Sequence, residues 1–322
     1  MSLRDALLTR NAEAIPGRRD EAWRWSDLKG VLRPLPEVSA AVQPLPERPE
    51  LGTFGDVIVR RHAAPVAAGL TDAELVLAAG ETLLLVDIFE PGEGGYVRDA
   101  CLPIRIEAGA SLTRLVLAED GADAVSVILS EVVLEAGAAF AQTVIASGAK
   151  RQRIETRVSH PGHGANVRLD GAYLLNGKRH ADQTTLVDHV GPGGESRQLI
   201  RGVAADQSRG VFQGRIIVRE GADGTDARLT HNALMLSEKA EIDAKPELEI
   251  YADDVSCAHG NTVGALDEDA LFYACARGIP ETEARLMLIE AFIGEIVERI
   301  DSEPLRALAR SFVATRLEAL RS

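Results

Sequence analysis

The chain contains few cysteines and few aromatic residues. Its three cysteines, Cys101, Cys257 and Cys275, form no CxxC pair and are odd in number. This count fits neither a disulfide framework nor a preformed tetrathiolate metal site, and it leads us to expect a reducing, cytoplasmic location. Aromatic residues make up only 4% of the chain, which argues against an enzyme that binds polysaccharide on aromatic platforms.

A long apolar run and a basic cluster are also absent from the sequence. The apolar runs at 83–86 and 125–129 end well before the roughly 18 residues that a membrane helix needs. The first residues are too charged for a signal peptide, and we expect instead a helix over 2–15 with Ser2 as its N-cap. Lys and Arg number 35 against 49 Asp and Glu, giving a net charge of −14. We therefore expect no binding to nucleic acid or to a membrane.

The patterns that are present divide the chain into three parts. Residues 1–50 are expected to form an N-terminal helical segment and a linker, because five prolines fall between residues 34 and 49. Residues 51–265 carry short β-branched runs separated by glycine, and residues 266–322 carry helical periodicity. Trp23 and Trp25 lie in the first part, and we interpret them as packing anchors.

Glycine recurs in the middle part with a regular period. The steps between the marker glycines are 28, 27, 30 and 27 residues; the markers are Gly109, Gly137, Gly164, Gly194 and Gly221. A unit of this length cannot bury its apolar face without a stacked neighbour, and glycine suits its tight corners. A parallel β-helix is therefore predicted, with one face of each strand inward and the other in solvent. A β-sandwich is the alternative architecture.

Two amphipathic helices are predicted after Gly278. The first begins near Pro280 and the second near Ser302. Their apolar stripes are expected to pack together; the stripes are Leu286, Ile289, Ile293, Ile296 and Ile300, and Leu305, Leu308, Phe312, Leu317 and Leu320. Cys275, just before these helices, is interpreted as a core residue, and Cys101 as structural.

A Cys-x-His pair is the strongest candidate for chemistry. Cys257 and His259 follow Asp253 and Asp254 in a strand-like segment, and all four residue types bind metals. Residues two apart share one strand face about 7 Å apart, so a thiolate and an imidazole can converge on one iron. The pair is predicted to face outward, opposite the apolar residues of its strand. Two ligands fall short of the roughly four that a closed site needs, so another chain would complete it.

His231 is predicted to lie near His259, because the 28 residues between them match the glycine period. A nucleophilic Cys–His enzyme is a further interpretation of the pair. It lacks an oxyanion turn and the strand-to-helix elbow that usually presents a nucleophile. The glycine-rich stretch 191–194 lacks the Lys-Ser/Thr of a phosphate-binding loop, so we expect no nucleotide binding.

Several motifs together resemble the C-terminal signature of the SufB/SufD family. They are Pro246-Glu247-Leu248-Glu249-Ile250, Asp253-Asp254-Val255, Cys257-Ala258-His259-Gly260, Thr262-Val263-Gly264 and Leu271-Phe272-Tyr273. Upstream, Phe212-Gln213-Gly214-Arg215-Ile216 and Asn232-Ala233-Leu234-Met235-Leu236-Ser237 extend the resemblance. Gly260 and Gly264-Ala265-Leu266-Asp267 resemble the SufD branch. The chain also has no cysteine between Cys101 and Cys257, a region in which the SufB branch carries an essential one.

The resemblance implies a right-handed parallel β-helix flanked by helical N- and C-terminal parts. It implies a non-catalytic subunit of an iron–sulfur cluster assembly complex, which pairs with SufB and contacts the ATPase SufC through its C-terminal helical domain. The functional histidine of the family falls on His259 and its neighbouring cysteine on Cys257. His231, Asp253 and Asp254 would then support this pair.

The cargo implied by the resemblance is transient iron or a nascent cluster shared with SufB, with none held tightly by the isolated chain. No residue is assigned to a resident cofactor. Two alternatives stay open: a SufB-like or homodimeric scaffold that holds the cluster alone, and a β-helix enzyme that acts on polysaccharide.

Overall fold

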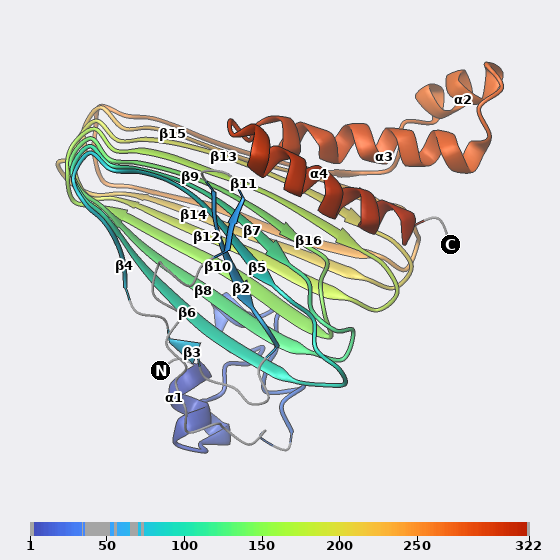
Figure 1. Ribbon diagram of the computed structural model, residues 1–322, viewed down its shortest axis with the longest axis horizontal. Coiled ribbons are helices and arrows are strands. Elements are labelled where there is room, and N and C mark those ends of the chain that lie inside the picture. The colour runs from blue at the N-terminus through green and yellow to red at the C-terminus, as the bar shows by residue number, and fades with distance from the viewer. Residues whose placement is uncertain are drawn as a thin grey trace.

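The computed structural model describes residues 3–33, 35, 52–54, 57–64, 70–71 and 74–320. Two long β-sheets face each other, helices follow at the C-terminal end, and a small helical segment lies at the N-terminal end (Figure 1). The linker prolines between residues 34 and 49, and the predicted N-cap Ser2, lie outside the described residues. No helix in the described ranges is long and apolar enough to cross a membrane.

From β4 onward, consecutive strands alternate between the two sheets, so each successive pair makes one coil of a solenoid. The first sheet has the order β1-β2-β5-β7-β9-β11-β13-β15-β17, and the second has β16-β14-β12-β10-β8-β6-β3 with β4 also beside β6. Every strand pair is parallel except β1 with β2. Neighbouring strands of a β-sandwich run antiparallel. The predicted parallel β-helix is therefore confirmed, and the sandwich alternative is wrong.

The strands lengthen to about ten residues along the solenoid. Those of the first sheet are β1 Gly52–Phe54, β2 Val57–His62, β5 Thr82–Phe89, β7 Ser111–Ala118, β9 Ala139–Ala146, β11 Asn166–Leu175, β13 Glu195–Ala204, β15 Asp226–Met235 and β17 Ser256–Gly264. Those of the second are β3 Leu70–Thr71, β4 Leu75–Leu77, β6 Val97–Ile106, β8 Val125–Leu134, β10 Arg151–His160, β12 His180–His189, β14 Arg209–Val218 and β16 Glu241–Ile250.

The corners between strands depend on glycine. Four of the predicted corner glycines have the left-handed φ that these turns require; they are Gly109, Gly137, Gly164 and Gly221. At the remaining corner the left-handed residue is Gly193, with φ 65°, rather than the predicted Gly194. Gly194 is needed for a different reason, because a Cβ there would lie 2.4 Å from the His160 ring.

Aliphatic side chains stack in columns inside the solenoid. One column of the second sheet runs through five successive strands, and each member is at most 2% exposed; it is Ile104, Val132, Val158, Val187 and Ile216. Burying one such side chain contributes about 1.5–3 kcal/mol. Because the register is regular, the inward side chains of each coil pack directly on those of the coils beside it.

A buried ion cluster stands in the interior near the first coils. Asp87 accepts hydrogen bonds from Arg60 and Arg114, each at 2.6 Å, and lies 2.8 Å from His62 Nε2. Asp87 and Arg114 are fully enclosed. Burial by itself raises the pKa of Asp87, but the charges of Arg60 and Arg114 outweigh it and hold that pKa well below its ordinary value.

Helices cover the outer face of the first sheet at the C-terminal end. They are α3 Glu281–Glu298 and α4 Glu303–Glu318, so both predicted helices are present, while α2 Glu268–Ala276 packs against α3. Apart from Leu286, the residues of the predicted stripes form one apolar cluster with outward residues of the sheet such as Val86 and Leu115. Polar contacts add to this packing, because Arg299 lies 3.0 Å from the buried Asp170. Cys275 lies on α2, which was not predicted as a separate helix, and it is half-buried rather than a core residue.

The N-terminal segment packs on the outer face of the second sheet. It contains α1 Leu3–Leu8 and the short helices η1 Ala12–Ala14 and η2 Glu21–Trp23. The single helix predicted over 2–15 is wrong, because Arg10 adopts a left-handed φ of 49° and interrupts it. Leu7 packs against Val125 and Val127. The outer face of the second sheet is therefore covered here, where the alternating pattern predicted solvent.

The Asp87 cluster leads to a stability prediction. Asp87→Asn leaves Arg60 and Arg114 buried without their carboxylate, so we expect a loss of about 3–5 kcal/mol in urea unfolding. The depressed pKa of Asp87 means that its contribution is complete above about pH 4 and is lost as pH falls through the lower folded pKa. The variant should therefore lack this acid-dependent component.

Glu90 provides the matched control for this cluster. It pairs with Arg61 at 2.5 Å on the neighbouring rungs, but its side chain is 37% exposed. Glu90→Gln should cost less than about 1 kcal/mol. Equal losses for the two variants would contradict the role assigned to the buried cluster.

Candidate functional site

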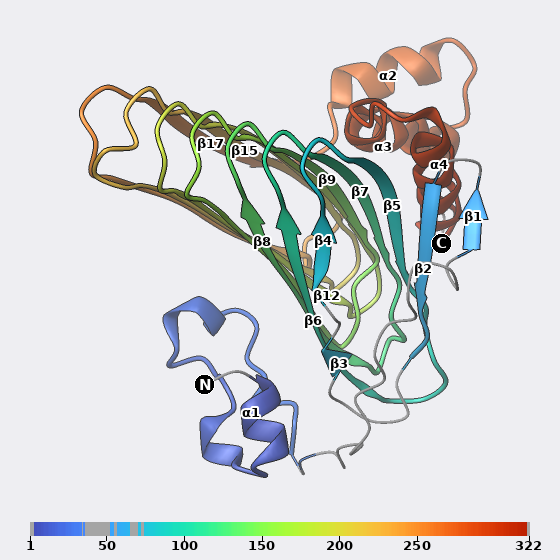
Figure 2. The same cartoon turned by 60° about the vertical axis from the view of Figure 1, so that its left-hand side comes forward.

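The last coil of the solenoid, formed by β16 and β17, is not covered by another coil. Along β15 the inward residues are buried, whereas the residues of β17 are exposed apart from the half-buried Cys257. The residues of β16 are mostly half-buried. Figure 2 shows this coil at the end of the solenoid opposite β2. An inward face that would be core in any other coil is here accessible.

The register of β17 on β15 shows which way the Cys-x-His pair points. Cys257 is aligned with Ala227, and His259 is aligned with Leu229. Ala227 and Leu229 are inward residues, 0% and 1% exposed. Aligned residues in a parallel ladder share a face, so the pair lies on the inward face. The prediction that it faces outward is wrong, and its accessibility comes from the missing next coil.

Cys257 lies at the border between core and solvent. Its side chain packs against the interior cluster that contains Phe212 and Leu229. Burial raises the pKa of the Cys257 thiol. Coordination of a metal would oppose this effect, because it favours the thiolate form. His259 is exposed beside it on the same face.

His231 is fully buried and is aligned with Asn261 rather than with His259. It shares the inward face with His259 but lies two positions away along the neighbouring strand. Its Nδ1 is 2.6 Å from Asn261 Oδ1, and its Nε2 is 2.9 Å from the Tyr173 hydroxyl. Burial lowers the pKa of His231 to about 4, so the ring is neutral, donates through Nδ1 and accepts from Tyr173. The arrangement holds the Asn261 side chain on the same strand face as the exposed pair, two positions beyond His259.

The predicted acidic residues lie in the bend before β17. Asp253 and Asp254 are exposed, and the Asp254 carbonyl accepts a hydrogen bond from the Gly224 amide at 2.7 Å. Within the described ranges, no group of three or more His, Cys, Asp and Glu side chains converges as a metal site. Cys257 and His259 are thus two donors on one strand face, with the mixed sulfur and nitrogen character that suits iron.

A buried pair of histidines, His160 and His189, was not predicted from the sequence. His160 Nε2 lies 2.5 Å from His189 Nδ1 inside a corner of the solenoid, and both residues are fully buried. Burial, together with the neighbouring His160, lowers the pKa of His189 to about 3. The second ring nitrogen of His189 is bonded to Ser196 Oγ at 2.9 Å. Their separation of 29 residues, one coil, is the signal that would have identified them.

The chain was compared with known protein families. Residues 62–292 match the family described as SUF system FeS cluster assembly, SufBD core domain. This range covers the strands from β3 to β17 and ends within α3.

Individual relatives agree with the family match. The iron–sulfur cluster assembly protein SufD of Escherichia coli is 32% identical, over 76% of this chain and 58% of that protein. A SufBD family protein of Synechocystis is 28% identical over 70% of this chain and 50% of its own length. One from Mycobacterium bovis is 27% identical over 97% and 92%. The chain thus spans little more than half the length of the first two relatives and nearly all of the third.

The environment of Cys257 predicts a slow thiol. In a Cys101→Ser/Cys275→Ser variant, iodoacetamide should modify Cys257 several-fold more slowly than it modifies glutathione at pH 7.5, because burial raises the pKa and limits access. Mass spectrometry of timed samples gives the rate. A variant that keeps only Cys275, on the projecting α2, is the matched control. Modification of Cys257 faster than that of glutathione would show an activated thiol instead.

Proposed function

The chain belongs to the SufBD family of iron–sulfur cluster assembly proteins and is SufD-like, and from this premise we propose that it is a non-catalytic subunit that pairs with SufB and contacts the ATPase SufC. In this role it supports iron acquisition and the assembly of a nascent cluster. Iron or the cluster is cargo shared across the interface. His259 is the principal ligand in this proposal, and Cys257 is a supporting or alternate one.

The uncovered last coil is the observation that carries the proposal. A solenoid end with a free strand edge and accessible inward residues is a liability that proteins normally cap or pair. Large apolar side chains are exposed here, including Ile250, Tyr251 and Val263 at 43%, 59% and 39%. A partner with a similar β-helix end would cover these side chains and continue the stack.

The number of available metal ligands supports a site shared with another chain. Cys257 and His259 offer two donors, and His231 behind them already uses both ring nitrogens. A cluster or a closed iron site needs about four protein ligands. The remaining donors would come from SufB, and the cargo would leave when the two subunits separate.

The C-terminal helices offer a separate surface for SufC. Figure 1 shows α2 and the beginning of α3 projecting beyond the strands, while the rest of α3 and α4 lie against the sheet. Phe272 and Tyr273 on α2 are 75% and 59% exposed, and Met287 on α3 is 49% exposed. Exposed aromatic and Met side chains on a projecting helix are typical of a protein-binding surface.

A SufB-like or homodimeric scaffold is the second candidate, because two copies of the same open end would also supply four donors. Anaerobic reconstitution of the isolated chain distinguishes the two. A stable cluster with one equivalent per dimer would favour the scaffold. Family membership leaves the polysaccharide enzyme without support.

Cluster assembly in the complex tests the site. The chain should co-purify with SufB and SufC, and His259→Ala should reduce the initial rate of cluster formation at least tenfold while the complex stays intact. Absorbance near 420 nm during anaerobic reconstitution measures the rate. The control is His163→Ala, which removes an exposed histidine at a distant corner. Failure to co-purify would contradict the partners, and normal assembly by His259→Ala would contradict the site.

The α2 surface is tested by substitution of one exposed aromatic residue. Phe272→Ser should weaken retention of SufC at least tenfold in a pull-down titration and leave SufB pairing unchanged, because α2 projects beyond the strands of the solenoid. Val190→Ser removes an apolar side chain that is 40% exposed at a corner and should leave both contacts unchanged. Equal retention of SufC by both variants would place its contact elsewhere.

A further inference from the structure

A surface pocket of about 340 Å³ lies between the N-terminal segment and the outer face of the second sheet. Glu21 and Ala22 form one wall, and outward residues of β10, β12, β14 and β16 form the floor. Cys257 and His259 belong to the inward face of the other sheet. The proposed role in cluster assembly therefore makes no use of this pocket.

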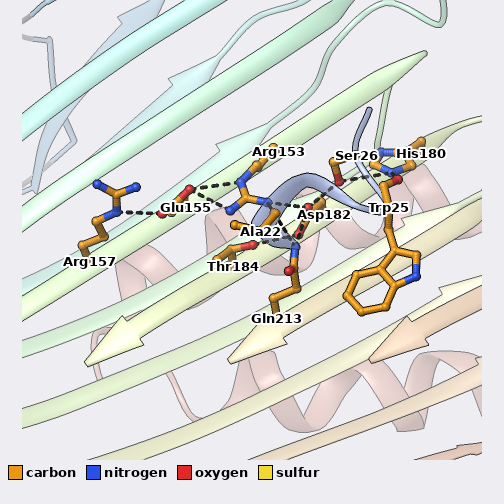
Figure 3. Close-up of polar contacts among 10 residues, drawn as sticks. All are labelled: Ala22, Trp25, Ser26, Arg153, Glu155, Arg157, His180, Asp182, Thr184 and Gln213. Carbon is orange, nitrogen blue, oxygen red and sulfur yellow. Dashed lines mark hydrogen bonds and ion pairs between the residues drawn. The ribbon is translucent and has the colours of Figure 1, made fainter. Parts of the chain in front are cut away.

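Buried hydrogen bonds hold the wall of the pocket in place (Figure 3). Asp182, which is 1% exposed, accepts from Ser26 Oγ, from Arg153 at 3.0 Å and from Gln213 at 3.1 Å. The same Arg153 and Gln213 side chains donate to the Ala22 carbonyl, at 2.5 and 3.3 Å. One buried carboxylate thus joins the N-terminal segment to three strands of the sheet.

Further contacts extend this attachment around the pocket. The Trp23 ring lies 4.2 Å from the Arg153 guanidinium. His180 Nε2 is 3.0 Å from the Trp25 carbonyl, and Lys245 bonds to Glu21 at 2.6 Å across the rim. Trp23 is therefore a packing anchor, as the sequence predicted, whereas Trp25 contributes its backbone carbonyl. Together these contacts hold the wall in position.

The floor has an apolar gap between two arginines. Arg157, Leu186 and Arg215 are aligned on three successive strands, so the two arginine backbones are about 10 Å apart with Leu186 between them. Arg157 bonds to Glu155 at 2.7 Å, and Arg215 bonds to Glu247 at 3.1 Å. Both arginine side chains are nearly half exposed, at 46% and 42%. Each therefore keeps a face open to a ligand above Leu186.

Charges of both signs surround the pocket. Four cations and three carboxylates line it; the cations are Arg153, Arg157, Arg215 and Lys245, and the carboxylates are Glu21, Glu155 and Glu247. Three further carboxylates pair with these arginines from outside the lining; they are Asp182, Glu131 and Glu249. A ligand with charge of one sign would approach like charges as closely as opposite ones. A zwitterion can satisfy both signs, since its carboxylate fits a guanidinium fork and its ammonium fits a neighbouring glutamate.

We propose that this pocket binds a small zwitterion of the α-amino-acid class with an aliphatic side chain. The opposite charges of an α-amino acid lie on adjacent groups, as do those of the Arg157–Glu155 and Arg215–Glu247 pairs. The ligand can therefore align against one pair in the reverse order. Its side chain then lies on Leu186, and the wall formed by Glu21 and Ala22 shields it from water.

Matched probes test the chemistry of the ligand. L-Leucine carries both charges, isopentylamine lacks the carboxylate and 4-methylpentanoate lacks the ammonium, while the aliphatic part stays the same. Saturation-transfer NMR on the full chain should show leucine binding, with an affinity at least tenfold higher than that of either analogue. No transfer to leucine at millimolar concentration, or equal binding of all three probes, would overturn the proposal.

Two variants locate the binding. Leu186→Trp fills the gap on the floor and should abolish the leucine signal, whereas Arg219→Ala, which removes an exposed arginine paired with Asp188 outside the pocket, should leave it unchanged. Circular dichroism checks that both variants fold. If Leu186→Trp is misfolded, Arg215→Leu takes its place with the same expected loss. Leucine binding that survives in a folded floor variant would refute the assignment.

Discussion

The stacking of one coil on the next is the constraint on which the rest of this structure depends. In a parallel ladder, aligned residues of successive coils share a face of the sheet. Each coil therefore buries its inward side chains against the coils beside it. Columns such as Val132–Val158–Val187 show how completely this works in the middle of the chain. The same rule makes the last coil incomplete, because β16 and β17 have no further coil to cover them. The candidate site and the proposed docking of a partner both follow from that incompleteness.

The sequence predicted the architecture well because the period and the corner glycines are local signals. It placed the two C-terminal helices correctly, since a 3-4 spacing of apolar residues needs no tertiary information. Register was harder. The glycine period suggested 28 residues per coil, but β17 follows β15 at a distance of 30 residues, so His231 aligns with Asn261 and not with His259. A difference of two residues keeps the same face and changes the neighbour.

The direction in which a strand residue faces, and whether another segment covers it, depend on long-range contacts that a local sequence pattern does not reveal. Leu248 and Ile250 lie on β16, whereas Cys257 and His259 lie on β17, which begins after a bend. The prediction treated both segments as one regular strand. The alternation of faces does not continue through the bend, so the predicted orientation of the pair was wrong. Likewise, Val125 and Val127 alternate with Ser126, which predicts solvent on one side, yet the N-terminal segment covers them. The buried Ser26–Asp182 contact joins residues 156 positions apart. No local pattern announces a pairing at that distance.

The two ends of the solenoid differ in the polar groups that they place on the inward face. Near the first coils, charged groups neutralise one another inside, with Asp87 held between Arg60 and Arg114. At the last coil the accessible inward groups are a thiol, an imidazole and an amide, none of them carrying a fixed charge. Neutral donors can be covered by another protein without the desolvation cost of an unpaired ion. An inward placement points Cys257 and His259 into the interior of the solenoid, beside the position that the next coil would occupy. A partner that continues the stack would therefore bring its own inward residues against them, and a metal held there would lie inside a shared interior.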